Sequence, residues 1–484
     1  MRDLFETRRV LVLILALGIF ALATRPATDP DLWWHLRTGQ LTIQTHHISH
    51  TDPYSFTRPG QPWIDHEWLS EVLMYGMYRI AGLGSLIILF AAIVSASFMI
   101  VFFRCRGSPY FAALLTIWAA IASVPLFGVR PQMLSLFMGS LLLLLLDSSV
   151  ARPALLWWTV PLMLLWVNLH AAYALGLVFI FLYLAGEAVE ALFHEAGAGT
   201  RWVRVKRLAM LMVLTTATVP FNPNGVRIFS YPFQTLRSPT MQSFINEWSS
   251  PNFHNANYFP FTLLLLTLII TLPVSRGRIK VRELLLVGFA TAAALFSVRH
   301  IPLFAIIAPP ILSLKTKAWF DNTSKRLSSP GVRATSNPIW LNSLVLAALV
   351  VFVGVRVRFT LANQPKWEAE SFPAHAIVFL RNNEASQPLL NHYNWGGYMI
   401  WKLYPRYRVY IDGRADVYGD SLMRDFASAY YLSDDWQTIL QRAEIRTVML
   451  PPDAPLITGL RSHPGWKQVY SDSQATIMVK VSTQ

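Results

Sequence analysis

The polar stretch at residues 29–71 concentrates acids, imidazoles and indoles directly after the first apolar segment of the chain. Asp29 and Asp31 are two residues apart in DPDLWWH. This spacing suits two oxygen ligands for a divalent cation such as Mg or Mn, or a general base for an acceptor hydroxyl or amide. Asp is also a common helix N-cap, so the pair could simply begin a helix at WWHL. We favour the chemical role, because capping and catalysis can coexist.

Three further side chains in the same stretch are candidates for the site. His35 and His66 could act as ligands, bases or phosphate donors, or as interfacial hydrogen-bonding groups. Glu67, in DHEWL, could bind a metal or orient an acceptor. The residues that follow it, 68–80, form an amphipathic stretch that is expected to lie along the membrane interface before the next span.

Two arginines and a histidine stand at the edges of apolar segments. Arg130 lies in GVRPQ, and Arg299 and His300 lie in SVRHIP. A guanidinium can bind a phosphate through two hydrogen bonds. We therefore predict that these residues bind the phosphate of a lipid-linked donor. The alternative is that the side chains snorkel from helix ends towards water.

Polar residues recur at the other turns on the same predicted side. Asn168 and His170 lie in WVNLH and Glu247 lies in INEWSSP, where they could face an acceptor or a shared cavity. Hydrogen bonding between helices is the alternative for the first two. In the tail, Trp395 and Tyr398 of WGGY offer stacking surfaces to an acceptor, or else pack in a tight turn.

The composition places these residues in a membrane protein. Apolar residues make up 54% of the 484 and charged residues only 14%, against roughly a quarter in soluble domains. A net charge of +14 would suggest nucleic acid for a soluble chain, but cationic loops at a cytosolic membrane face explain it more simply, so no nucleic-acid partner is expected. The single cysteine, Cys105, excludes a disulfide framework.

The apolar segments predict about eleven membrane helices, several of them shorter than the roughly 20 residues that cross a bilayer. They are expected at 10–24, 82–103, 109–127, 132–146, 154–167, 171–190, 208–220, 258–274, 283–298, 301–314 and 339–357. Alternate loops are rich in Lys and Arg, which predicts a cytosolic N-terminus and an external C-terminal tail.

The tail has normal charge content and short apolar runs, such as 409–411 and 448–450, separated by turn residues. It is expected to form a small α/β domain outside the cytosol. The predicted fold class is therefore an α-helical polytopic membrane protein with a small C-terminal α/β domain. Its predicted domains are 1–360, with a catalytic first external loop at 25–81, and 361–484.

The chain resembles the GT-C superfamily of membrane glycosyltransferases, which includes the catalytic subunit of oligosaccharyltransferase and the protein O-mannosyltransferases. DPDLWWHLR is similar to the acidic motif that follows the first span in that superfamily. A bacterial group of glycosyltransferase-like membrane proteins is also similar in its motifs, namely HEWL, VRPQ, WVNLH, NPNG, EWSSP, VRHIP, WGGY and IDGRAD. The resemblance implies an acid from Asp29 or Asp31 as base or metal ligand, with external cations binding a polyprenyl phosphate.

We therefore expect an inverting glycosyltransferase of the bacterial inner membrane. It would move a sugar from a polyprenyl-phosphate carrier to a glycan, lipid or protein acceptor, with membrane lipid around it and Mg or Mn as the candidate cofactor. One alternative is a transporter or flippase, which predicts Gly- or Pro-broken spans in matched halves. Another is a non-catalytic membrane scaffold, which predicts that the external acids tolerate substitution.

Overall fold

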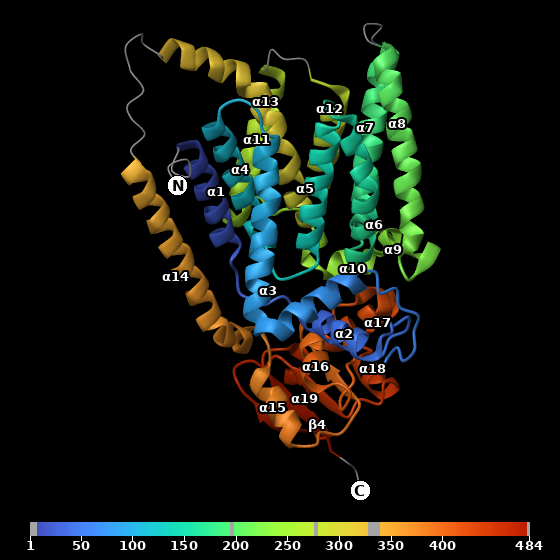
Figure 1. The fold of residues 1–484 in the computed structure, drawn as a ribbon. Helices are drawn as coiled ribbons and strands as arrows, with labels where there is room; N and C mark the ends of the chain where they lie inside the picture. The colour runs from blue at the N-terminus through green and yellow to red at the C-terminus, as the bar shows by residue number, and fades with distance from the viewer. Residues whose placement is uncertain (1–6, 194–197, 275–278, 328–338, 482–484) are drawn as a thin grey trace. The chain divides into compact units, whose positions relative to one another are not determined.

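The computed structural model describes residues 7–193, 198–274, 279–327 and 339–481, and most of them are helical (Figure 1). The longer helices are α1 (Thr7–Ala23), α2 (Leu32–Thr45), α3 (Trp68–Arg104), α4 (Pro109–Ser123), α5 (Gln132–Ser148), α6 (Thr159–Leu169), α7 (Tyr173–Phe193), α8 (Ala198–Thr218), α11 (Phe259–Val274), α12 (Val281–Phe296), α13 (Ile301–Leu327), α14 (Ile339–Ser371) and α17 (Ala415–Tyr430). The shorter ones are α9 (Tyr231–Arg237), α10 (Pro239–Phe244), α15 (Ala374–Asn382), α16 (Gly396–Leu403), α18 (Trp436–Arg442) and α19 (Pro455–Arg461).

Short segments of 3-10 helix, three to six residues long, join many of these elements. They are η2 (Val124–Leu126), η3 (Pro153–Trp158), η4 (Val219–Phe221), η5 (Gly225–Phe229), η6 (Asn246–Trp248), η7 (Ala256–Tyr258), η8 (Val298–His300) and η9 (Tyr393–Trp395). Three of them, η6, η8 and η9, carry candidate residues named from the sequence.

The predicted fold class is confirmed. Each apolar segment expected from the sequence falls on a helix, and six described helical segments are long and apolar enough to cross a membrane. Three further apolar helical segments are shorter, at Arg9–Ala23, Gln132–Ser148 and Pro153–Leu169. The protein is therefore a membrane protein with a small C-terminal sheet.

The chain divides into two compact units, each built from separate stretches of sequence. The first unit contains Met1–Arg25, Ile87–Phe221 and Ile245–Thr360. The second unit contains Pro26–Leu86, Asn222–Phe244 and Leu361–Gln484. The polar stretch after α1 therefore folds in the same unit as the C-terminal tail.

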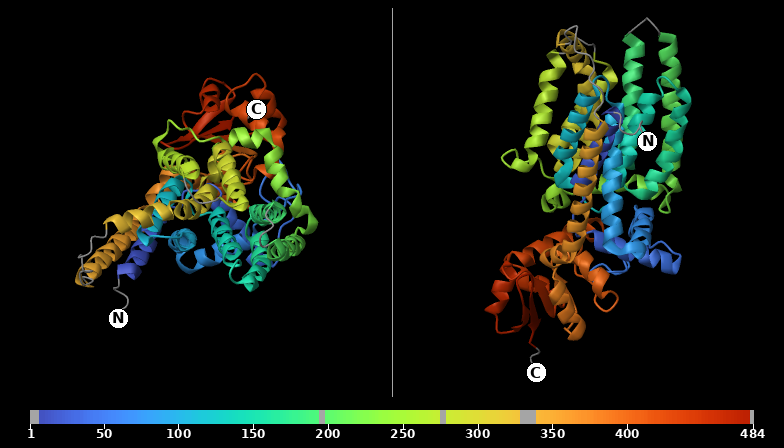
Figure 2. Two further views of the ribbon diagram at one scale, coloured as in Figure 1. Left: turned by 90° about the horizontal axis from the view of Figure 1, so that it is seen from above. Right: turned by 60° about the vertical axis from the view of Figure 1, so that its left-hand side comes forward.

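The first unit is a bundle of apolar helices. Helix α7 lies beside α8 and α12, and α13 packs against α4, α11 and α12 (Figures 1 and 2). Burial differs greatly among these helices: 83% of the most apolar part of the α13 segment is buried, against 22% for the α11 segment. A helix that is apolar all round and largely exposed is typical of a lipid-facing span.

Helix α3 contains a break at the junction of its two parts. Ala81 and Gly82 have non-helical backbone angles, and Gly82 has a φ of +62°, a region that only glycine enters without strain. The break falls at the predicted boundary between the amphipathic stretch at 68–80 and the span at 82–103. It lets the two parts of α3 take different directions.

The second unit contains a four-stranded sheet in the order β1-β2-β4-β3. Its strands are β1 (Leu389–Asn391), β2 (Thr447–Leu450), β3 (Trp466–Ser471) and β4 (Thr476–Lys480). Strands β1 and β2 are parallel, whereas β4 is antiparallel to both β2 and β3. The residues of β1 and β2 are fully buried, and helices α15 and α19 contact strands of the same sheet, which makes the tail an α/β structure as predicted.

The apolar run at 409–411 lies outside the described sheet. The run at 409–411 forms only an isolated bridge between Ser55 and Val409. The side chain of Asn391 takes the place of a neighbouring strand, because its Oδ1 accepts from Tyr410 N–H (2.8 Å) and its Nδ2 donates to Ile411 O (2.7 Å). A side chain thereby satisfies the backbone groups that a ladder would have paired.

Candidate functional site

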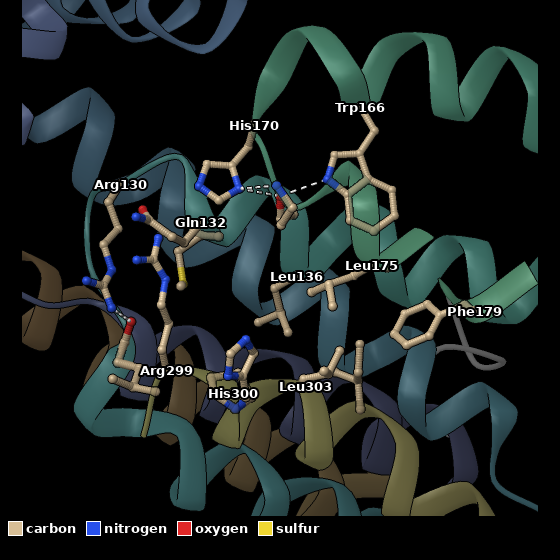
Figure 3. A pocket seen from close by; sticks show the side chains of 17 residues that line it. Arg130, Gln132, Leu136, Trp166, His170, Leu175, Phe179, Arg299, His300 and Leu303 are labelled. Atoms are coloured by element: carbon tan, nitrogen blue, oxygen red, sulfur yellow. Dashed lines mark hydrogen bonds between the residues drawn. The ribbon is translucent and has the colours of Figure 1, made fainter. Parts of the chain in front are cut away.

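The first unit contains a cavity of about 100 Å³ between the ends of its helices. Two cations, Arg130 and Arg299, line one side of it, and apolar side chains such as Leu136, Phe179 and Leu303 line another (Figure 3). The cavity also borders His170 and His300. It therefore combines a cationic part with an apolar part, which is the form that suits an amphiphilic anion.

Arg130 is paired with an acid from a distant loop. Its Nη1 lies 2.5 Å from Glu247 Oε1, and its Nη2 donates to Leu126 O (3.0 Å). Burial opposes ionisation of Glu247, but the charges of Arg130 and Arg299 outweigh it and hold the pKa of Glu247 below its usual value. The structure thus places a carboxylate against the cationic part of the cavity.

Two hydrogen bonds join η6 to η8, which carries Arg299. Ser297 Oγ donates to Glu247 O (2.8 Å), and Val298 N–H donates to Ser249 O (2.9 Å). Trp248 lies beneath the Arg299 guanidinium, with 5.2 Å from Cζ to the ring centroid, and its ring lies 6.0 Å from that of His300. The motifs EWSSP and VRHIP therefore form one structure.

His170 belongs to a chain of side-chain hydrogen bonds within the first unit. Trp166 Nε1 donates to Ser135 Oγ (2.8 Å), which lies 2.9 Å from His170 Nδ1 (Figure 3). Ala172 N–H also donates to that Nδ1 (3.2 Å). Because Nδ1 accepts, we assign the ring proton to Nε2. By contrast, Asn168 Nδ2 donates back to Leu164 O (2.9 Å) within α6.

In the second unit, the two aspartates share one turn at the start of α2. Asp31 N–H donates to Asp29 Oδ1 (2.9 Å), and Trp34 Nε1 donates to Asp31 Oδ1 (3.1 Å). Asp31 stands at the N-cap position of α2 but makes no side-chain capping bond. Helix capping alone therefore does not account for its carboxylate.

Three glycines allow the tail to approach this turn closely. A Cβ at Gly413 would stand 1.7 Å from Asp31 Oδ1, and one at Gly397 would stand 2.5 Å from Pro30 O. A Cβ at Gly396 would stand 2.3 Å from Ile411 O. The glycines of WGGY and IDGR are thus explained by packing around the turn that holds the aspartates.

His35 is fully enclosed beside two glutamates of the same stretch. Its Nδ1 lies 3.1 Å from Glu71 Oε1, and its Nε2 lies 3.8 Å from Glu67 Oε1. Burial lowers the pKa of His35 well below its usual value, and the nearby His66 and Arg414 lower it further. The imidazole is therefore neutral at physiological pH.

His66 also contacts Glu67, with 3.4 Å between Nε2 and Oε1. Its ring stacks on Tyr231 at a centroid distance of 4.0 Å. His35, His66 and Glu67, which the sequence predicted as separate candidates, thus form one buried cluster.

The structure places Trp395 and Tyr398 inside the second unit. Tyr398 is 2% exposed, stacks on Phe372 (4.9 Å between centroids) and donates to Glu368 Oε1 (2.8 Å). Trp395 is 5% exposed, with its ring 5.1 Å from that of His392. Both rings have packing partners within the tail.

The IDGRAD motif forms a buried ionic network. Arg414 Nη1 lies 2.8 Å from Asp52 Oδ1, and its Nη2 donates to Asp412 Oδ2 (2.7 Å). Its guanidinium also lies over the rings of Tyr54 and Trp63, with Cζ 4.8 Å and 4.9 Å from the centroids. Arg414 therefore joins the polar stretch to the tail.

Asp29 and Asp31 fit a divalent cation by their donor chemistry. Carboxylate oxygens are hard ligands of the kind that Mg and Mn prefer. The shared turn holds Asp29 Oδ1 2.9 Å from the backbone N of Asp31, and the absence of a Cβ at Gly413 leaves room for the Asp31 carboxylate. Two carboxylates supply part of an octahedral shell, and substrate phosphate and water commonly supply the rest.

Several residues of the site were missed by sequence reasoning. Ser135 was recognisable only as a hydroxyl in an otherwise apolar helix, and Trp166 as an indole among many. Gly413 and Glu71 carried no distinguishing signal, since their roles depend on residues distant in sequence.

No protein-family model matches the chain, and no curated protein sequence matches it. Its structure is similar to the archaeal oligosaccharyltransferase AglB from Archaeoglobus fulgidus, which was solved with an inhibitory peptide and a dolichol-phosphate. The TM-score is 0.56 over 90% of this chain and 68% of that one, at 10% sequence identity. It is also similar to ArnT from Cupriavidus metallidurans bound to undecaprenyl phosphate, with a TM-score of 0.50 over 98% of each chain and 14% identity.

These similarities define the class of fold. Both solved proteins are GT-C glycosyltransferases, and together they cover nearly the whole of this chain. The chain therefore has the GT-C membrane fold, which confirms the resemblance stated from its motifs.

Proposed function

We propose that this protein is an inverting glycosyltransferase that moves a sugar from a polyprenyl-phosphate carrier to a glycan, lipid or protein acceptor. The observation that carries the proposal is the cavity of the first unit, in which Arg130 and Arg299 line one part and apolar side chains line another. A polyprenyl phosphate has the same division into an anionic head and an apolar chain. The similar structure of ArnT, bound to undecaprenyl phosphate, supports this donor class.

The reaction assigns distinct roles to the two units. In the second unit, Asp31 or Asp29 removes the proton of the acceptor hydroxyl or amide. The acceptor atom then bonds to the anomeric carbon as the bond from that carbon to the phosphate oxygen breaks. The bonding electrons leave with the polyprenyl phosphate, so its negative charge increases, and a single displacement inverts the anomeric centre.

In the first unit, the cations stabilise the departing phosphate. Arg130, Arg299 and His300 provide N–H donors aimed at a group whose charge grows in the transition state. His170 lines the same cavity, with its Nδ1 oriented by Ser135. A divalent cation held by Asp29 and Asp31 would supply Lewis-acid chemistry when bound.

We further propose that the protein lies in a bacterial inner membrane with its N-terminus in the cytosol. The distribution of Lys and Arg among the loops supports this orientation. The catalytic stretch and the tail would then face away from the cytosol, where a lipid-linked donor is used without a nucleotide.

The test is transfer by Asp29→Asn and Asp31→Asn variants. We expect each to lose activity by at least about 100-fold, because the amide neither accepts the proton nor carries the charge. Expression and thermal stability should match the parent protein. Full activity in the double variant would contradict the proposal and favour a scaffold, for which these acids are dispensable.

A further inference from the structure

A second pocket in the first unit lies at the other end of the helices that frame the Arg130–Arg299 cavity. It has a volume of about 370 Å³ and is lined by the end of α7, the start of α8, the start of α12 and the segment after α5. Helices α5, α7 and α12 run from one pocket to the other. They contain 17, 21 and 16 residues.

The length of these helices places the second pocket at a membrane surface. At a rise of 1.5 Å per residue, they span about 24–32 Å, close to the roughly 30 Å of a hydrocarbon core. The second pocket therefore lies about one bilayer core from the opposite ends of these helices, where Arg130 and His170 line the first cavity. A ligand of the second pocket would lie at the level of the phospholipid head groups opposite the proposed transfer site.

The second pocket carries an excess of positive charge. Its lining has more cations than acids, and the charged residues are Arg201, Arg204, Arg207, Lys280, Arg282, Glu187 and Glu190. Five cations against two carboxylates leave a surplus of three positive charges. Soluble nucleotides and lipid head groups share the chemistry that such a surplus attracts, namely phosphate.

The two carboxylates, of Glu187 and Glu190, already form ion pairs and hydrogen bonds with residues around the pocket. Glu187 Oε1 lies 2.8 Å from Arg282 Nη1 and 3.1 Å from Arg204 Nε. Glu190 accepts from Val281 N–H at the start of α12 (2.9 Å) and lies 3.4 Å from Arg201 Nη1. Arg207 and Lys280 are exposed at the mouth, where they can reach an incoming anion.

Exposed aromatic and apolar side chains surround the same end of the bundle. Trp157 and Trp158 of η3 are 38% and 65% exposed, and Trp202 of α8 is 40% exposed. Trp is enriched where a protein meets the head-group layer of a bilayer. Val203 lines the pocket itself and is 48% exposed, which places an apolar surface beside the cations.

We propose that this pocket binds the phosphodiester head group of an anionic phospholipid. The cations of α8 and α12 hold the phosphate, while the acyl chains follow the apolar surface next to Val203. Basic pockets between membrane helices on the cytosolic side bind anionic head groups by the same chemistry. The site is separate from the donor cavity, and its occupancy does not depend on the proposed transfer reaction.

The experiment measures lipid binding to the full-length protein in detergent by native mass spectrometry. The probes are dioleoyl-phosphatidylglycerol and, as a neutral control, dioleoyl-phosphatidylcholine. We expect the anionic lipid to bind at least about tenfold more tightly than the neutral one. The double variant Arg207→Gln/Lys280→Gln should lose most of this preference, because it removes two cations from the mouth.

The matched control is Lys206→Gln, which removes an exposed cation from the same helix without altering the pocket lining. It should bind the anionic lipid as the parent protein does, and all variants should share the parent's melting temperature. Equal binding of the two lipids, or an unchanged preference in the double variant, would overturn the proposal. Equally tight binding of glycerol 1-phosphate would assign the site to a soluble phosphate instead of a lipid and would also overturn it.

Discussion

The carboxylate of Asp31 occupies the space that a side chain at residue 413 would fill. A Cβ on Gly413 would stand 1.7 Å from Asp31 Oδ1, far inside van der Waals contact. Because Gly413 has no side chain, the carboxylate of Asp31, the proposed catalytic acid, can occupy this position.

Gly413→Ala should therefore reduce transfer by about 100-fold, although it removes no functional group. The methyl group must displace the Asp31 carboxylate. A displacement of about 1 Å at a reacting group can lower the reaction rate by about 100-fold. The measurement is the rate of transfer by purified protein. Gly76→Ala is the control, because a Cβ there meets no atom within 4 Å. Equal rates for both variants would show that the position of Asp31 is unimportant.

Arg130→Gln should weaken the binding of polyprenyl phosphate by tenfold or more. A hydrogen bond to a charged group contributes about 1.5–3 kcal/mol, which corresponds to that range of affinity. Glu247→Gln should have the opposite effect and tighten binding several-fold, because Glu247 Oε1 is the anion that pairs with Arg130 in the structure. Calorimetric titration of each variant with undecaprenyl phosphate measures both changes. Weaker binding by Glu247→Gln would mean that the acid orients Arg130 and does not compete for it.

Ser135→Ala should slow transfer by about tenfold while leaving the KM for the donor nearly unchanged. Ser135 Oγ joins Trp166 Nε1 to His170 Nδ1, so its loss frees the His170 ring to change orientation and tautomer. The pH profile of the rate should shift in Ser135→Ala, which a purely structural change would not cause. Ser135→Thr keeps the hydroxyl and should restore the rate. A threonine variant as slow as the alanine variant would argue against this role.

Asp65→Asn should stabilise the protein at high pH. Burial raises the pKa of the Asp65 carboxyl to about 7, even though the charge of Arg414 favours the ionised form. The unfolded chain loses this proton near pH 4 and the folded chain near pH 7, so the folded state binds more protons in between. The contribution of Asp65 to stability therefore falls as pH rises from about 4 to 7 and then stays low.

Thermal unfolding in detergent at pH 4, 6 and 8 tests this sign. One pKa unit corresponds to about 1.4 kcal/mol, so the gain at pH 8 should be on the order of 2 kcal/mol, since the buried Asn amide offsets part of it. Below pH 4 the gain should disappear. Asp453→Asn, at an exposed position, serves as the control and should leave the pH dependence unchanged. A gain that is equal at all three pH values would contradict the assigned protonation of Asp65.

The class of protein was predictable from sequence because its signals are local. Each apolar segment falls on a helix of the structure, since hydrophobicity over about 20 residues is a property of the segment alone. The GT-C resemblance rested on the acidic motif at Asp29 and Asp31, and the fold bears it out. The change of composition near residue 361 likewise predicted that the tail forms a small α/β domain.

The partners of these residues were decided by tertiary structure. Nothing in the sequence pairs Arg130 with Glu247, 117 positions away, or sets Gly413 against Asp31. The same holds for the apolar run at 409–411, where Tyr410 N–H and Ile411 O bond to the side chain of Asn391. A local pattern determines which face of a segment is apolar, whereas the identity of the atoms opposite a given side chain depends on how distant segments pack.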